Sequence, residues 1–142
     1  MLDLEQYKSQ AYNIIGAAME VQRTLGCGLL EAVYSEALHL ELLDRGIENE
    51  TEKEVPCYYK GHKMEKTYRM DMTVGDICIE LKSVNELLPV HRAQLFNYLR
   101  LTRMPVGILI NFGGSKLEGE RYAFIEEENE CYLIDKDMHF VE

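Results

Sequence analysis

Three residues near the middle of the chain, Asp71, Glu80 and Lys82, have the types and spacing that metal-assisted phosphate chemistry requires. From Cys78 onward, polar or small residues alternate with apolar ones. Period two in a strand therefore places Glu80 and Lys82 side by side on one face, with isoleucine and leucine on the other. A turn at residues 75–76 would fold the chain back and bring Asp71 to the same place.

Two carboxylates and an amine at one point suit a Mg²⁺ ion and a phosphate group. Mg²⁺ prefers oxygen ligands, often one or two carboxylates completed by phosphate oxygens and waters. A metal held in this way polarises a phosphate and activates water, while a lysine stabilises the charge that develops. The simpler alternative is a solvated strand face with a Glu–Lys pair that contributes little energy. The four histidines show no metal-ligand spacing to one another, and only His91 falls near the proposed site.

Periodicity predicts the elements that must position these residues. Helices are expected over 4–25, 29–44 and 90–103. Strands are expected over 47–59, 63–74, 76–83, 106–112, 121–125 and 131–134. The second helix is expected to bury the apolar stripe Leu30, Val33, Ala37, Leu40 and Leu43. The order predicts a single α/β (α+β) domain over residues 1–142, with a mixed sheet that contains an antiparallel three-strand meander and is flanked by helices. Pro56 marks an edge or a bulge in the first strand.

The charge of the chain argues against a tight grip on nucleic acid. Asp and Glu outnumber Lys and Arg by 25 to 15, which gives a net charge of −10. Nucleic-acid affinity is dominated by phosphate neutralisation, so strong DNA binding by this chain alone is not expected. No recognition helix, zinc finger or aromatic–basic stacking strip stands out. No apolar run is long enough to span a membrane, and the four scattered cysteines favour reduced thiols in a cytoplasmic protein.

Two further sets of residues lie on the predicted helices. Gly28, Glu31 and Tyr34, in GLLEAVY, recur at i, i+3 and i+6, roughly along one helix face. Glu31 either complements the helix dipole in the first turn or points at the sheet as another acidic group, and the residues leave these alternatives equal. Gln94 and Tyr98, at i and i+4, are either a half-buried pair or a pair that holds a nucleotide or the attacking water.

Taken together, these sets resemble the GxxExxY proteins, a group of the PD-(D/E)XK nuclease superfamily, in its RecB-like branch. The naming motif is present at residues 28–34. The resemblance continues through ELK at 80–82, PVHRAQLFNYL at 89–99 and GILINFG at 107–113, and covers roughly residues 14–122. Met70 stands where the name of the superfamily has proline.

The resemblance implies a fold and a site. The superfamily core is a helix, a three-stranded meander, a helix and a further strand, similar to the order predicted above. The implied catalytic residues are Asp71, Glu80, Lys82, Gln94 and Tyr98. The implied ligands of Mg²⁺ or Mn²⁺ are Glu31, Asp71 and Glu80.

The implied reaction is metal-dependent hydrolysis of a nucleic-acid phosphodiester, with Lys82 placing the attacking water and Gln94 and Tyr98 lining the pocket. The residues favour neither DNA nor RNA as the substrate. Two alternatives stay open. One is a non-catalytic module that keeps the nuclease fold for binding or assembly, in line with the negative charge. The other is a nuclease subunit that acts only with a protein partner or as a homo-oligomer, which would supply the grip on phosphate.

Overall fold

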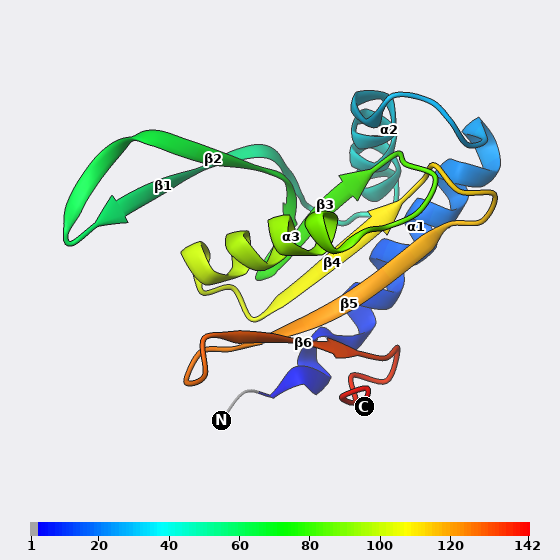
Figure 1. Cartoon of the computed structure of the whole chain (residues 1–142). Helices are drawn as coiled ribbons and strands as arrows, with labels where there is room; N and C mark the ends of the chain where they lie inside the picture. The colour runs from blue at the N-terminus through cyan, green and yellow to red at the C-terminus, as the bar shows by residue number, and fades with distance from the viewer. Residues whose placement is uncertain (1–2) are drawn as a thin grey trace.

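The computed structural model describes residues 3–142, which are organised around one six-stranded sheet (Figure 1). The helices are α1 (Lys8–Leu25), α2 (Glu31–Asp44) and α3 (Pro89–Thr102), and a short 3₁₀ helix, Leu4–Tyr7, precedes α1. The strands are β1 (Glu50–Tyr59), β2 (His62–Val74), β3 (Ile77–Lys82), β4 (Val106–Asn111), β5 (Glu118–Ile125) and β6 (Glu130–Ile134). Within the described residues, no helix is long and apolar enough to cross a membrane.

The sheet is mixed, as the sequence predicts. Its strands lie in the order in which they occur along the chain. The β1–β2–β3 meander is antiparallel, β3 and β4 are parallel, and β5 and β6 complete the sheet in antiparallel fashion. Parallel neighbours need a crossover, and α3 supplies it between β3 and β4. The predicted α+β class and the three-strand meander are confirmed.

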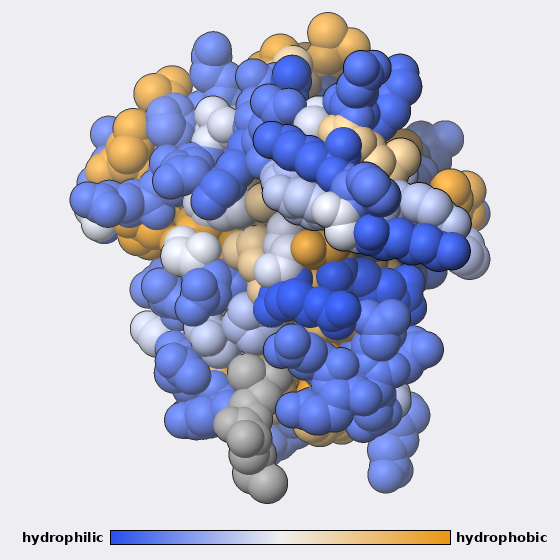
Figure 2. Space-filling model, turned by 90° about the vertical axis from the view of Figure 1, so that its left-hand side faces the viewer, coloured by the Kyte–Doolittle hydropathy of each residue, from blue (hydrophilic) through white to orange (hydrophobic). Residues whose placement is uncertain are grey.

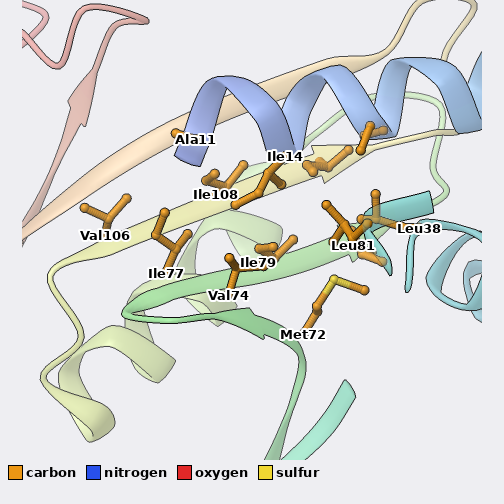
Figure 3. Close-up of a cluster of buried hydrophobic side chains, with 14 of the residues drawn as sticks. Ala11, Ile14, Leu38, Met72, Val74, Ile77, Ile79, Leu81, Val106 and Ile108 are labelled. Atoms are coloured by element: carbon orange, nitrogen blue, oxygen red, sulfur yellow. The ribbon is translucent and has the colours of Figure 1, made fainter. Parts of the chain in front are cut away.

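The two faces of the sheet are covered by different helices (Figure 1). One core lies under α1 and α2 and takes the apolar side chains of β3, as Figure 3 shows for Ile77, Ile79 and Leu81. The other core lies under α3 and takes Cys78 from the opposite face of the same strand. The face that carries Glu80 is therefore covered by a helix, and the alternative of a solvated strand face is wrong.

The predicted buried stripe of α2 is also wrong. The helix buries Tyr34, Leu38 and Leu42, which are fully enclosed and recur at i, i+4 and i+8. Four of the five predicted residues are instead at least 42% exposed: Leu30, Val33, Leu40 and Leu43. Because α2 is apolar on two sides, its periodicity did not fix which side packs on the sheet. The helix also starts at Glu31, so Gly28 lies before it and shares no helix face with Glu31.

The meander forks at Asp71. β3 pairs with β2 only at residues 72–74, while β1 and β2 continue together as a ribbon that leaves the body of the molecule (Figure 1). The register of β1 on β2 skips the pair Glu52–Asp71, and Glu52 has a left-handed backbone with φ of 52°. Farther along, the register shifts between Pro56 and Tyr58, so the irregularity predicted at Pro56 is confirmed. The fork leaves space beside Asp71 that a continuous sheet would fill.

Candidate active site

Asp71 and Glu80 meet at the fork of the meander. The register of Met72 on Ile79 would place Asp71 opposite Glu80, one step beyond the last paired residues. Instead of a ladder bond, the Leu81 amide donates a hydrogen bond to Asp71 Oδ2 at 2.9 Å. Cross-strand residues on one sheet face are close neighbours, so the two carboxyl groups adjoin, as the sequence predicts.

Glu80 is enclosed, with 2% of its surface exposed. Its Oε2 atom is buried and has no hydrogen-bond partner within the described residues. Burial raises the pKa of Glu80 well above its ordinary value, the hydrogen bond to Asp71 and the charge of Asp71 raise it further, and Lys82 opposes them. The nearby Glu31 also raises this pKa, so Glu31 lies close enough to act on the pair electrostatically. The site is short of positive charge.

Lys82 and the pair on α3 lie on the same side of the sheet as Glu80. The half-buried Lys82 donates from Nζ to Gln94 Oε1. Tyr98 is 4% exposed, and its hydroxyl donates to the Arg69 carbonyl oxygen at 2.8 Å. Burial, with the charge of Glu80, raises the pKa of Tyr98 to about 12. Tyr98 therefore binds the backbone of β2 just before the fork and positions that strand.

Glu31 is held by the loop between α1 and α2. The Tyr34 hydroxyl donates to the Gly26 carbonyl at 2.6 Å and accepts from the Leu29 amide at 3.1 Å. Ser83 Oγ donates to the Leu29 carbonyl at 2.6 Å and so ties this loop to the end of β3. These bonds bring the first turn of α2 toward the residues that follow Lys82. A carboxylate in that turn is also favoured by the helix dipole.

A pocket of about 440 Å³ opens between α2, the start of β1 and the fork. Its walls are formed by Glu31, Ala32, Ser35, Glu36, His39, Thr51, Glu52, Asp71 and Leu81. These residues include four carboxylates and neither lysine nor arginine. Glu80, which is buried, does not line this pocket. A strongly negative pocket of this kind attracts cations.

The histidine in this pocket is His39, so the expectation that only His91 falls near the site is wrong. His39 Nδ1 lies 2.6 Å from Asn49 Oδ1, while the His91 ring nitrogen accepts the Leu88 amide at 2.9 Å at the start of α3. Helical spacing held the missing signal, because Glu31 and His39 stand at i and i+8 on one face.

The acidic residues fit a divalent ion that keeps most of its waters. Within residues 3–142, no three histidine, cysteine or acidic side chains form a ready-made cage. Mg²⁺ seldom uses such a cage, since it dehydrates reluctantly and takes one or two carboxylates. Asp71 beside Glu80, with its unpartnered buried oxygen, meets that requirement.

Asn111 is a structural residue that the sequence did not single out. It is fully buried at the end of β4, and its Oδ1 accepts the Val84 and Gly113 amides, each at 3.0 Å. Its Nδ2 donates to the Val84 carbonyl at 2.9 Å. A Cβ atom on Gly113 would lie 2.3 Å from Val84 backbone atoms, so only glycine fits. The pattern Asn-Phe-Gly after an apolar strand was the available signal, and it fixes the loop that follows Lys82.

The match to a family model decides the relationship of this chain to known proteins. The model described as the PD-(D/E)XK nuclease superfamily matches residues 8–122. The chain belongs to the PD-(D/E)XK nuclease superfamily. No curated protein matches the sequence. Among solved structures, the crystal structure of SSO0001 is similar, with a TM-score of 0.52 at 22% identity. The match covers 82% of this chain and 58% of the SSO0001 chain, so it shows a shared fold and nothing finer.

Proposed function

We propose that this member of the PD-(D/E)XK nuclease superfamily hydrolyses nucleic-acid phosphodiester bonds with the help of Mg²⁺ or Mn²⁺. The observation that carries the proposal is the Glu80 carboxylate, which is buried beside Asp71 with one oxygen unpartnered. Burying such a group is costly unless a cation or a donor compensates it. Superfamily members typically use a divalent metal, and an ion beside Glu80 and Asp71 would compensate the cost of burying this carboxylate. The motif at residues 28–34 further supports membership of the GxxExxY group.

In this proposal, Asp71 and Glu80 hold the ion and Glu31 is a further or outer-shell ligand. When bound, the ion would polarise the phosphate as a Lewis acid and lower the pKa of a bound water. Lys82 stabilises the negative charge that develops on the phosphate and orients the attacking water. Gln94 fixes the amine through its hydrogen bond.

Tyr98 contributes by holding β2 at Arg69, two residues before Asp71. It is thus a positioning residue, whose hydroxyl is committed to the backbone. The proposed substrate is DNA or RNA.

The direct test compares Glu80→Gln with Glu36→Gln, a matched change in an exposed carboxylate of the same pocket. Cleavage of single-stranded DNA, duplex DNA and RNA would be followed with Mg²⁺ and with Mn²⁺. We expect Glu80→Gln to lose at least about 100-fold in rate and the control to stay close to the wild type. Metal-dependent cleavage that survives Glu80→Gln would refute the assignment.

Calorimetric titration with Mn²⁺ separates the proposal from a non-catalytic module. We expect binding that Asp71→Asn weakens strongly, because it removes a charge from the adjoining carboxyl pair. Failure of the wild-type chain to bind Mn²⁺ in the millimolar range would favour the module. Binding without cleavage would favour a subunit that needs a partner.

A further inference from the structure

The ribbon formed by β1 and β2 extends beyond the sheet, and its outer part, residues 56–69, is here called the hairpin arm (Figure 1). Its tip is a two-residue turn at Lys60 and Gly61, both with positive φ, which closes the strands tightly. β3 pairs only with residues 72–74 of β2, so the arm has no strand neighbour on either edge within the described chain. At about 3.3 Å per residue, the tip lies roughly 30 Å along β2 from Asp71.

The hairpin arm is basic in an acidic protein. It contains four basic residues, Lys60, Lys63, Lys66 and Arg69, and one acidic residue, Glu65, while Glu54 lies opposite Arg69 at its base. None of these four cations forms an ion pair with a carboxylate anywhere in residues 3–142. The arm therefore presents free positive charge, which the net charge of −10 conceals.

The same arm exposes aromatic rings next to these cations. Tyr58 and Tyr59 are each 62% exposed at its outer end, and Tyr68 is 50% exposed near its base. Antiparallel register sets Tyr58 beside Lys63, and Lys60 lies 5.5 Å from the centre of the Tyr59 ring. Large exposed rings are unfavourable in water, and three of them along one unpartnered ribbon mark a contact surface. Figure 2 views the molecule from the side on which the arm projects, where hydrophobic groups interrupt a largely hydrophilic surface.

The arm leads directly to the candidate active site. The Tyr68 ring packs edge-to-face on Tyr98, with centroids 5.9 Å apart. Tyr98 also binds the Arg69 carbonyl, and Asp71 follows two residues later. A strand lying along the arm would thus pass Tyr68 and reach the fork where Asp71 and Glu80 meet.

We propose that the hairpin arm binds single-stranded nucleic acid and guides it to the fork. The proposal rests on the proposed function for what happens at the fork, and on the arm alone for binding. Cations that track a backbone together with rings on which bases stack are the features of sequence-tolerant single-strand binding. Bases in a duplex are already stacked on one another, so the tyrosines favour a single strand. The linear sequence hid these cations and rings, because the ribbon brings them together from two strands.

The test measures binding without cleavage. Fluorescence anisotropy of a labelled thymidine oligonucleotide would be followed in EDTA for the wild-type chain and three variants. Lys63→Gln with Lys66→Gln removes two arm cations, and Tyr58→Ser with Tyr59→Ser removes the outer rings. Lys116→Gln with Lys136→Gln is the matched control, since both lysines are exposed and lie outside the arm.

We expect the lysine pair to weaken binding at least tenfold and to lower the slope of log affinity against log salt by about 1.4, since each phosphate contact to a single strand contributes about 0.7. The tyrosine pair should weaken binding at least fivefold with the slope unchanged, and the control should stay within twofold. Duplex of the same length should bind more weakly, and this preference should vanish in the tyrosine variant.

Three outcomes would overturn the inference. The first is no binding by the wild-type chain at low salt. The second is equal affinity of the arm variants and the control. The third is sedimentation that shows a dimer dispersed by the arm substitutions without any effect on the oligonucleotide, which would make the arm a contact between copies. Because cleavage is absent from this readout, arm substitutions without effect on binding, together with intact Glu80-dependent cleavage, would refute the arm alone. Binding intact without cleavage would refute the proposed function alone.

Discussion

The burial of the Glu80 carboxyl group beside Asp71 is energetically unfavourable, and a purely structural role would not explain it. A carboxyl group on a helix-covered strand face could be replaced by an apolar residue with a gain in stability, yet here it adjoins Asp71 and leaves Oε2 without a partner. Groups whose pKa values are shifted by burial and by a like charge are concentrated at functional sites. We therefore expect that replacing Glu80 raises the stability of the metal-free protein and lowers its activity.

Glu80→Gln should stabilise the metal-free protein. The amide can donate to Asp71 without taking up a proton, which we expect to add about 1–3 kcal/mol to the free energy of unfolding at pH 8. Because the folded pKa of Glu80 is raised, the folded state binds more protons than the unfolded state above the ordinary pKa of glutamate. Wild-type stability from this group thus falls as pH rises toward the folded pKa, and the advantage of the variant should grow from pH 5 to pH 8. Urea unfolding in EDTA at both pH values measures it.

Glu36→Gln is the control for this experiment, because Glu36 is exposed in the same pocket. Its unfolding free energy should track the wild type at both pH values. Saturating Mn²⁺ should reverse the order of stability, since an ion that binds only the folded wild-type site adds to its stability. A destabilised Glu80→Gln protein in EDTA would show that the carboxylate is satisfied as it stands.

Gln94→Leu should impair turnover without preventing folding. The substitution removes the oxygen that accepts the hydrogen bond from the Lys82 amine, and it keeps a side chain of similar size on α3. Loss of an outer partner that orients site residues typically lowers activity about 10–100-fold. We expect that loss in kcat, with KM nearly unchanged, in a steady-state cleavage assay. A fall in kcat accompanied by an equally large change in KM, or an unchanged kcat, would show that Gln94 does not position Lys82.

At the scale of elements, α2 shows which information the sequence lacks. Its apolar residues occupy two faces, and the buried face is chosen by a long-range contact: the Tyr34 ring stacks on Phe112 of the β4 end at 4.4 Å. Periodicity predicted that a helix exists, but it did not predict which face of the helix packs on the sheet. In β3 the alternation was unambiguous, because one face is wholly apolar, and its prediction is confirmed.

Leu38→Ala and Leu40→Ala test the rotation of α2. Leu38 is fully buried, so its truncation should destabilise the fold by about 2–5 kcal/mol. Leu40 is 54% exposed, and the same truncation should change stability by no more than about 0.5 kcal/mol. Denaturant unfolding of the two variants measures the difference. A larger loss for Leu40→Ala than for Leu38→Ala would mean that the predicted stripe, and not the observed one, faces the sheet.

The ion pair between α3 and β5 should shape stability in acid. Arg92 binds Glu120 through two bonds of 2.8 and 2.9 Å, and this contact lowers the pKa of Glu120. A lowered folded pKa gives stability that is present above the ordinary glutamate pKa and is lost as pH falls through the folded value. Glu120→Gln should therefore cost about 1 kcal/mol at pH 7 and nothing at the lowest pH. Thermal unfolding between pH 7 and pH 3 measures it; a constant difference across that range would contradict it.

At the scale of the whole molecule, the sequence predicted the layers and the convergence at the fork, but not the arm. The order of elements and the meeting of Asp71 with Glu80 follow from local periodicity and one turn. The pocket around Glu31 and His39 depends on how α2 docks, and the arm depends on β3 ending its pairing at Met72, three residues from the turn. Both are tertiary facts without a local signature. The net charge of −10 pointed away from nucleic acid because it averages the basic arm with an acidic body.

The division between arm and body predicts that the arm can be shortened without loss of the fold. Pro56 and Thr67 face each other across the ribbon, so replacing residues 57–66 by Asn-Gly closes it with a favoured two-residue turn. The contacts of Tyr68 and Tyr98 remain in the shortened chain. We expect its melting temperature to fall by no more than about 4 °C, which corresponds to about 1 kcal/mol, and its Mn²⁺ affinity to match the wild type.

Calorimetry and Mn²⁺ titration measure these two quantities on the same preparation. A chain with the inner turn Gly75–Asp76 replaced by the same Asn-Gly pair is the control, since it keeps the whole arm. A large fall in melting temperature on shortening would mean that residues 57–66 belong to the folding core. Because neither core contains a residue of 57–66, the body holds all the packing that this prediction requires.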